Sequence, residues 1–222
     1  AVIYINTLLP FGAALYGKLT GRKVIYHIHE ISVTPAPLKA LLTGVARRTS
    51  CLNLYVSDTH RQTLPIAGVP ARRIYNVLDT PFIHTAFASI YSHRRDGIFR
   101  VLMIASLRDY KGIPEFMALV SALVDHTQIH FELVLNDDSA VVDRYFADQA
   151  IPATLAIHPR TRDTSTFYGR ASLLLNLSRV DQWVETFGMT ILEAMAFGIP
   201  VIVPPVGGPA ELVEDGRHGY WV

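Results

Sequence analysis

Short apolar runs alternate with segments of helical spacing along the whole chain, and this pattern restricts the fold more than any other feature. The apolar runs cover residues 2–6, 23–28, 52–57, 99–105, 130–135, 154–157, 172–177 and 200–203. The helical segments lie near residues 11–19, 37–48, 59–65, 112–125, 139–149, 164–171 and 187–197. Continuous apolar strands separated by helices are typical of parallel sheets covered on both faces. The sequence therefore predicts an α/β protein.

One stretch interrupts this alternation. Residues 78–98 show no clear period and contain several turn-forming residues, and a new strand–turn–helix unit begins at Phe99. We therefore place the border between two α/β units near residue 96, which gives units of residues 1–95 and 96–222. Ligands of open α/β sheets bind beyond the carboxyl ends of the strands, so the candidate site residues are those that follow each strand.

Composition and charge exclude several classes of protein. Hydrophobic residues make up 50% of the chain, charged residues 18%, and the formal net charge is +1. This is a globular composition, not a disordered one. The basic residues occur as scattered pairs, namely Arg47-Arg48, Arg72-Arg73 and Arg94-Arg95. We predict no nucleic-acid-binding face and interpret these pairs as solvated surface, with contact between a basic edge and an anionic membrane as the alternative.

The chain contains one cysteine, Cys51, which excludes a disulfide framework within the chain and a multi-cysteine zinc site. Its place before the apolar run 52–57 predicts a buried core thiol, and this cysteine usage agrees with a cytoplasmic location. No apolar run reaches the roughly 20 residues that span a bilayer, and no signal-peptide pattern is present. Because the sequence begins and ends within strand-like patterns, we interpret it as a fragment cut at both ends.

The segment 183–201 carries the most chemistry. It follows an apolar strand and predicts a loop and then a helix over about residues 187–197, ended by Gly198. Free backbone N–H groups at a helix start bind phosphates and hydroxyls. Here they would belong to Phe187, Gly188 and Met189.

Two glutamates bracket this helix start. Glu185 precedes it and Glu193 follows eight residues later, which is roughly 12 Å along a helix. Carboxylates accept hydrogen bonds from the paired hydroxyls of sugars and riboses. On spacing alone the simpler interpretation is structural, with Glu185 complementing the helix dipole and Glu193 solvated on the helix surface.

The segment from Glu185 to Gly219 resembles the signature of family 4 of the retaining glycosyltransferases. That signature places two glutamates, with seven residues between them, within E-[ST]-F-G-x-x-x-x-E-A-M-A-x-G-x-P-V. The sequence matches it at Glu185, Thr186, Phe187, Gly188, Glu193, Ala194, Met195, Ala196, Gly198, Pro200 and Val201. The family continues with a glycine pair, a glutamate and a later glycine. Gly207-Gly208, Glu211 and Gly216 or Gly219 match these positions.

The resemblance extends to a turn near residue 106. In the family a G-R-L…K-G turn binds the donor diphosphate through its arginine and lysine. Lys111-Gly112 match, but Ala105 replaces the glycine and Ser106 the arginine. Arg108 lies nearby and is the candidate to supply the missing charge.

Two further loops correspond to family positions. In the stretch 131–139, Asn136 and Asp138 stand where the family has glycines. The spacing of Asp137-Asp138 is not that of a metal-binding D-x-D, so we interpret the pair as a turn or a helix N-cap. The loop 158–161 matches the position that lines the base pocket.

Two histidines, His27 and His29, stand at the end of the strand 23–28. Alternation places His27 and His29 on one face of it, and zinc would need a third ligand that the sequence does not supply. A structural role is the simpler interpretation. The resemblance implies that His29 faces the donor sugar.

The resemblance implies the GT-B fold, with two Rossmann-like units, parallel sheets and a donor cleft between them. Residues 1–95 would be the later half of the acceptor-side unit, and residues 96–222 the donor-binding unit without its final helices. The implied function is transfer of a sugar from a nucleotide-sugar to a saccharide or lipid-linked acceptor, with retention of configuration, in polysaccharide biosynthesis.

The resemblance also assigns the site. The implied catalytic residues are Glu185, His29 and Lys111. The implied donor-binding residues are Ser106, Arg108, Lys111, Glu185, Phe187, Gly188, Met189 and Glu193. No metal or other cofactor is expected, and the location would be cytoplasmic or peripheral at the inner face of the membrane. Two alternatives remain, namely another GT-B enzyme such as a nucleotide-sugar epimerase, and a non-catalytic descendant that binds nucleotide or glycan.

Overall fold

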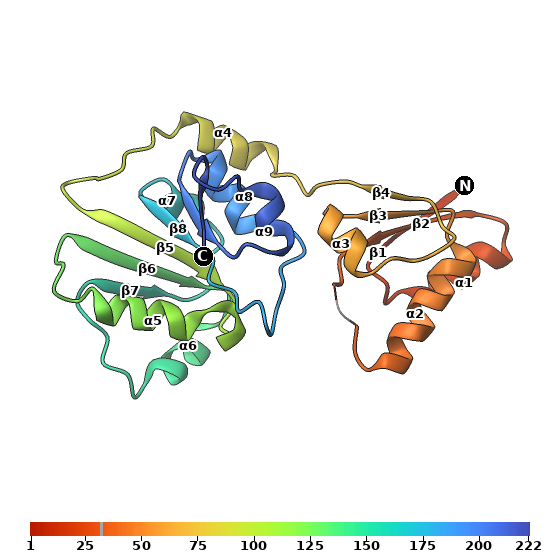
Figure 1. Ribbon diagram of the computed structural model, residues 1–222, viewed down its shortest axis with the longest axis horizontal. Coiled ribbons are helices and arrows are strands. Elements are labelled where there is room, and N and C mark those ends of the chain that lie inside the picture. The colour runs from red at the N-terminus through yellow and green to blue at the C-terminus, as the bar shows by residue number, and fades with distance from the viewer. Residues whose placement is uncertain (32) are drawn as a thin grey trace. The chain divides into compact units, whose positions relative to one another are not determined.

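The computed structural model describes residues 1–31 and 33–222 (Figure 1). The chain forms two compact units. The first contains Ala1–Val77 together with Glu185–Phe187, and the second contains Leu78–Val184 and Gly188–Val222. Each unit is built around its own parallel sheet.

The first unit has a parallel sheet of order β1-β2-β3-β4. Its strands are β1 (Val2–Asn6), β2 (Lys23–Ile28), β3 (Leu52–Tyr55) and β4 (Ala71–Arg73). Its helices are α1 (Phe11–Leu19), α2 (Ala36–Thr49) and α3 (Asp58–Thr63). The core of this unit contains Tyr26 and Ile28 from β2, Leu42 from α2 and Tyr55 from β3. These are four of the most deeply buried large side chains of the described chain.

The second unit has a parallel sheet of order β10-β9-β8-β5-β6-β7. Its strands are β5 (Phe99–Ala105), β6 (Ile129–Leu135), β7 (Leu155–His158), β8 (Leu173–Leu175), β9 (Val201–Val203) and β10 (Gly219–Trp221). Its helices are α4 (Thr80–Ala88), α5 (Ile113–Ala122), α6 (Ser139–Phe146), α7 (Ser165–Tyr168), α8 (Met189–Ala196) and α9 (Gly207–Leu212). A short 3-10 turn, η1, covers Asp109–Lys111.

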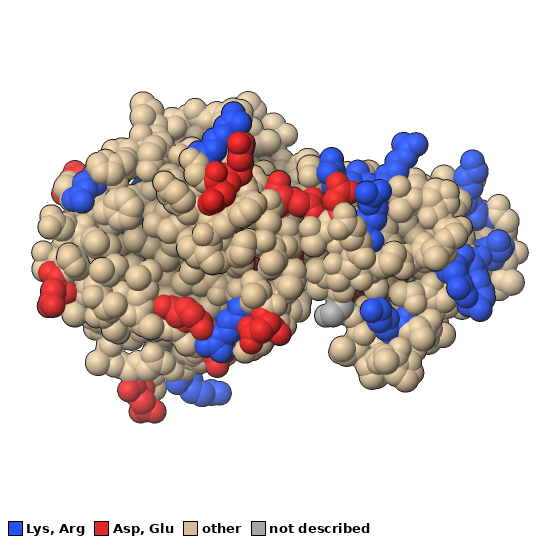
Figure 2. Space-filling view, viewed as in Figure 1, with Lys and Arg blue, Asp and Glu red and all other residues tan. Residues whose placement is uncertain are grey.

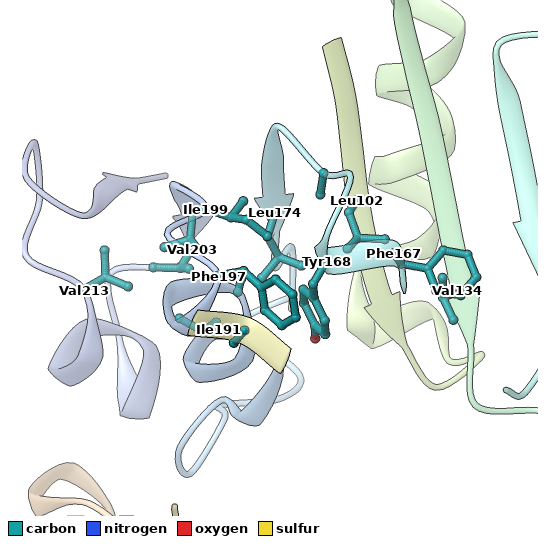
Figure 3. Close-up of a cluster of buried hydrophobic side chains, with 14 residues drawn as sticks. Leu102, Val134, Phe167, Tyr168, Leu174, Ile191, Phe197, Ile199, Val203 and Val213 are labelled. Atoms are coloured by element: carbon teal, nitrogen blue, oxygen red, sulfur yellow. The ribbon is translucent and has the colours of Figure 1, made fainter. Parts of the chain in front are cut away.

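Alternate residues of these strands face two separate cores. Val101 and Met103 of β5 pack in a cluster with residues of α5 and α6. Leu102 of the same strand packs on the other face, in a cluster with residues of α4, α7 and α8 (Figure 3). The period of two that strands impose therefore lets one apolar run cover both faces. This explains why the sequence shows uninterrupted apolar runs.

All eight predicted strands are present, and three of them, 2–6, 23–28 and 99–105, have the predicted bounds. The clearest difference is α4, which lies inside the stretch 78–98 that shows no period in the sequence. The side chain of Asp79 caps this helix by accepting a hydrogen bond from the N–H of Phe82 at 2.7 Å. Because α4 packs on α7 and α8, the compact units divide between Val77 and Leu78, ahead of the border predicted near residue 96.

Cys51 is exposed, so the prediction of a core thiol was wrong. β3 begins one residue later, at Leu52, and the Cys51 thiol donates to the Val24 carbonyl at 3.2 Å at the start of the strand. Within residues 1–31 and 33–222, no helix has both the length and the apolar character to cross a bilayer.

Candidate functional site

The order of the second sheet marks one place where a ligand can bind. β5 lies between β6, which follows it in the chain, and β8, which comes much later. The chain therefore leaves β5 toward β6 on one side and leaves β8 toward β9 on the other, which makes the boundary between β5 and β8 a topological switch point. Such switch points are the usual binding sites of open α/β sheets. The loop after β5 contains Ser106 to Gly112, and the loop after β8 leads to α8.

The start of α8 is shaped by Gly188. This residue has a φ of 101°, and a Cβ there would lie 2.8 Å from the Cδ1 atom of Ile191. The N–H groups of Ile191 and Leu192 donate to the Gly188 carbonyl at 3.1 and 3.2 Å. The N–H groups of Met189 and Thr190 precede these bonds and point out of the helix start, where an anion is favoured. The helix thus begins about two residues later than predicted, so Met189 belongs to its first turn and Phe187 does not.

Glu193 lies on α8 and is half-buried. The Oη atom of Tyr168, on α7, donates a hydrogen bond to its Oε2 atom at 2.6 Å. Burial raises the pKa of Glu193, the hydrogen bond from Tyr168 lowers it, and the negative charge of Asp79 raises it. The simpler interpretation of Glu193 as a solvated surface residue is therefore wrong, because the carboxylate is held from inside the unit.

The turn after β5 carries Lys111. Its ammonium lies 4.8 Å from the ring centroid of Trp183 and 5.9 Å from that of Tyr110. The two rings stack with centroids 5.3 Å apart at an angle of 27°. Cation–π contact of this kind holds a charged group without neutralising it. Lys111 is therefore placed beside the loop that leads from β8 to α8.

Arg108 lies in the same turn but is directed toward an acidic partner. Its guanidinium donates to the Leu107 carbonyl at 2.7 Å and lies 3.8 Å from the Asp137 carboxylate. Asp137 in turn accepts a hydrogen bond from the Leu107 N–H at 2.7 Å. This carboxylate thus joins the turn after β5 to the end of β6. Asp138 is the N-cap residue of α6, as predicted.

Ser106 is half-buried and contributes its carbonyl to the turn, where the Arg108 N–H donates to it at 2.8 Å. Ser106 carries no charge, so Lys111 is the positive group that this turn retains from the family pattern. Beyond the turn, the loop after β7 contains Arg160, whose side chain bonds to Asn136.

In the first unit, His27 of β2 and His29, just after the end of β2, lie on the same side of the chain, with ring centroids 4.3 Å apart. His27 Nδ1 lies 2.6 Å from the hydroxyl of Tyr4. The Nε2 atoms of both histidines are buried and have no hydrogen-bond partner within the described residues. Burial lowers the pKa of both rings, so both favour the neutral form at pH 7.

A third histidine, His60, is buried beside this pair, and sequence reasoning missed it. Its Nε2 atom lies 2.7 Å from the carbonyl oxygen of Glu30, and the positive charges of His60 and His29 each disfavour protonation of His27. The Glu30 carboxylate accepts hydrogen bonds from the N–H groups of Leu8 and His29. In the part of the chain that the structure describes, no three potential ligands are grouped to hold a metal ion.

The segment Glu185–Phe187 packs with the first unit. Phe187 is buried, and its ring centroid lies 5.7 Å from that of Tyr75. Glu185 is half-buried. The first signature glutamate therefore belongs to the compact unit of residues 1–77, while Glu193 belongs to the second unit.

Sequence reasoning missed Tyr168 and Trp183. Trp183 stands two residues before Glu185 in a loop that follows a strand, and an aromatic residue at that place is a usable signal for a ligand site. Tyr168 offers no such signal, because it stands 25 residues before Glu193 in the chain and meets that residue only through the packing of two helices.

Comparison with known proteins identifies the family. The profile of the family described as Glycosyl transferases group 1 matches residues 92–222, more than half of the chain. A sucrose synthase from Denitrovibrio acetiphilus is 33% identical over 81 residues, which are 36% of this chain and 10% of that protein. Spore coat protein SA from Bacillus subtilis is 23% identical over 186 residues, which are 75% of this chain and 48% of that protein.

Solved structures agree in fold along the whole chain. HepE from Anabaena, in complex with UDP and glucose, has a TM-score of 0.77 and 22% identity, and the match covers 100% of this chain and 63% of that one. The catalytic domain of starch synthase IV from Arabidopsis thaliana, bound to ADP and acarbose, has a TM-score of 0.68 and 15% identity, covering 97% and 59%. The chain therefore spans less than two thirds of each of these relatives. Its two parallel sheets have the GT-B arrangement, and the chain belongs to the group 1 glycosyl transferases.

Proposed function

We propose that the protein represented by this chain transfers a sugar from a nucleotide-sugar to a saccharide or lipid-linked acceptor with retention of configuration. The observation that carries this proposal is Glu193, a half-buried carboxylate fixed at 2.6 Å by a buried tyrosine at the second glutamate position of the family signature. A carboxylate held in this way accepts the hydroxyls of a ribose without having to reorganise.

The donor diphosphate would bind at the start of α8 and near Lys111. Cleavage of the bond between sugar and diphosphate leaves negative charge on the phosphate. The N–H groups of Met189 and Thr190, the positive end of the helix dipole and the Lys111 ammonium would all stabilise that charge. A site of this kind needs no metal ion. Ser106 and Arg108 would contribute less, because Ser106 is uncharged and Arg108 lies near Asp137.

Glu185 would bind hydroxyls of the donor sugar and stabilise the positive charge that develops on it as the bond to the diphosphate breaks. His29, whose pKa is lowered by burial, would meet the sugar as a neutral hydrogen-bonding group. We assign no catalytic base and no covalent nucleophile. As the family resemblance implies, the leaving phosphate would accept the proton of the acceptor hydroxyl.

The charge of the chain is unevenly divided, which supports a peripheral location at the cytoplasmic face of the membrane. Residues 1–77 contain nine Lys and Arg against two Asp and Glu, whereas the remaining residues contain 11 against 17. Figure 2 shows blue side chains gathered over the first unit and mixed charges over the second. On α1, Leu15, Tyr16 and Leu19 are exposed. The same helix carries Lys18, and the Arg22 guanidinium lies 5.0 Å from the Tyr16 ring centroid. Basic and apolar side chains together favour an anionic lipid surface.

The donor site can be tested by calorimetry with UDP, GDP and ADP, each with and without magnesium. We expect one of the three to bind, with equal affinity in the presence and absence of magnesium, and to bind at least tenfold more weakly to Glu193→Ala. Glu214→Ala, which removes an exposed glutamate of the same unit, should leave the affinity unchanged.

Binding that requires magnesium would contradict the metal-free site, and an unchanged affinity of Glu193→Ala would contradict the role of Glu193. Incubation of the bound nucleotide's sugar conjugate without an acceptor separates transfer from epimerisation. A transferase should leave the conjugate largely intact, whereas an epimerase would convert it.

A further inference from the structure

Tyr168 is a buried residue held between two other aromatic rings in the core of the second unit. It is 1% exposed and ends the short helix α7. Its ring stacks on that of Phe197, with centroids 5.6 Å apart at 25°, and meets the ring of Phe82 edge-on at 5.9 Å. Figure 3 shows the Tyr168 and Phe197 rings side by side in the cluster. Residues from α4, from α7 and from the end of α8 therefore fix the direction of the Tyr168 hydroxyl.

That hydroxyl is a polar group within an otherwise apolar cluster. It donates to Oε2 of Glu193 at 2.6 Å and lies 3.4 Å from the carbonyl oxygen of Thr190. A phenylalanine would pack in the same space and would not need a partner for a hydroxyl. Burial and the nearby Glu193 charge raise the pKa of Tyr168 above its ordinary value, so the phenol is protonated and remains a donor at neutral pH.

We propose that Tyr168 is a positioning residue for donor recognition, which fixes the Glu193 carboxylate through Oε2 and leaves Oε1 to accept the ribose hydroxyls. This inference rests on the proposed role of Glu193 in binding the ribose. It adds a residue outside the signature that makes the signature carboxylate selective for a ribonucleotide over its deoxy forms.

The hydrogen bond also affects the charge of Glu193. Burial and Asp79, at the start of α4, both favour the protonated carboxyl, and Tyr168 favours the ionised form. Loss of the hydroxyl would therefore raise the pKa of Glu193 further. A protonated carboxyl accepts fewer hydrogen bonds than a carboxylate, so the nucleotide would begin to dissociate at a higher pH.

The test uses Tyr168→Phe in the full chain and whichever of UDP, GDP and ADP the wild type binds, together with its 2′,3′-dideoxy counterpart. We expect Tyr168→Phe to bind the ribonucleotide about tenfold more weakly, and to bind the dideoxynucleotide as the wild type does. The acid limb of ribonucleotide binding should move to higher pH. Tyr91→Phe removes a comparable hydrogen bond, from a tyrosine hydroxyl to the Ser172 carbonyl at 2.9 Å, and should change none of these values.

A double-variant cycle shows whether Tyr168 acts through Glu193. In the Glu193→Ala background, Tyr168→Phe should have no further effect on ribonucleotide affinity. If Tyr168→Phe does not fold, Glu193→Gln supplies the second measurement, since a glutamine does not ionise and the part of the acid limb that belongs to Glu193 should be lost, while the part that belongs to the nucleotide phosphate remains. An acid limb that Glu193→Gln leaves unchanged would overturn the inference.

The outcomes separate this inference from the proposed function. Binding that Glu193→Ala weakens but Tyr168→Phe leaves unchanged would overturn the inference alone. Equal weakening of ribonucleotide and dideoxynucleotide by Tyr168→Phe would also overturn it, because a general loss of packing acts on both. A folded wild type that binds none of the three nucleotides would overturn the proposed function, and the inference with it.

Discussion

Gly112 and Gly216 both adopt positive φ, at 88° and 75°, but their surroundings differ. A Cβ on Gly112 would lie 2.3 Å from the carbonyl oxygen of Leu177, at the point where the loops after β5 and β8 approach each other. A Cβ on Gly216 would meet nothing within 4 Å. The glycine at 112 is thus required twice, for its backbone conformation and for the close approach of Leu177.

We expect Gly112→Ala to lower the free energy of unfolding of the second unit by about 3 kcal/mol. Gly216→Ala, which carries only the conformational cost, should lower it by about 1 kcal/mol. Urea unfolding followed by tryptophan fluorescence measures both, since Trp183 and Trp221 belong to this unit. If both variants lose the same free energy of unfolding, the close approach of Leu177 adds nothing to the cost of a side chain at position 112.

For individual residues, the sequence shows the spacing of the two glutamates directly, and it predicted the shared face of His27 and His29. It could not predict which groups bond to them, because Tyr168 reaches Glu193 across the packing of two helices. Arg108 illustrates the same limit. Its position in the turn made it a candidate for a missing charge, but the neighbouring carboxylate of Asp137 is visible only in the folded unit.

Among the helices and strands, α4 shows that the residues typical of a helix start can be present where the sequence shows no apolar period. Asp79 and Pro81 are typical first residues of a helix, and Phe82 and Ala86 stand four apart on its buried side. Nine residues give too few turns for a period to be recognised. The strands were easier to predict, because burial on both faces makes each of them a continuous apolar run.

The cap of α4 can be tested by a matched pair of substitutions. Asp79→Ala removes the acceptor of the Phe82 N–H bond and should destabilise the second unit by about 1 kcal/mol. Asp79→Asn keeps an acceptor oxygen and should be nearly neutral. Both are measured by urea unfolding. Equal destabilisation by the two variants would show that the charge of Asp79, and not its hydrogen bond, stabilises the helix.

For the whole molecule, the uneven charge predicts how the chain meets a lipid surface. We expect it to sediment with vesicles of phosphatidylglycerol and not with vesicles of phosphatidylcholine, and to be released by high salt because exposed charges are screened. Replacing Arg47 and Arg48 of the first unit by serine should weaken sedimentation several-fold.

Replacing Arg94 and Arg95 by serine changes the charge equally but in the second unit, and it should have little effect on sedimentation. If both double variants lose binding to the same extent, total charge matters and the first unit is not the contact surface. Sedimentation with phosphatidylcholine vesicles would contradict an electrostatic contact altogether.

The two-unit organisation was predicted because the helix–strand alternation runs through the whole sequence. The residue at which the chain passes from one unit to the other was not predicted, since it depends on the packing of α4 against α7 and α8. The assignment of Glu185–Phe187 to the first unit could not be predicted either, because in the sequence these residues are continuous with segments of the second unit.

Finally, α8 differs from an ordinary surface helix in having no exposed residue from Met189 to Ala196, whereas α6 exposes Ser139, Ala140, Val141, Asp143 and Arg144. A helix with one solvated face tolerates substitution on that face, at positions that recur about every three to four residues. In α8, Ile191 and Ala194 make core contacts, Glu193 is held by the bond from Tyr168, and the remaining residues are partly buried. A saturation-mutagenesis profile of α8 should therefore show fewer freely substitutable positions than a profile of α6.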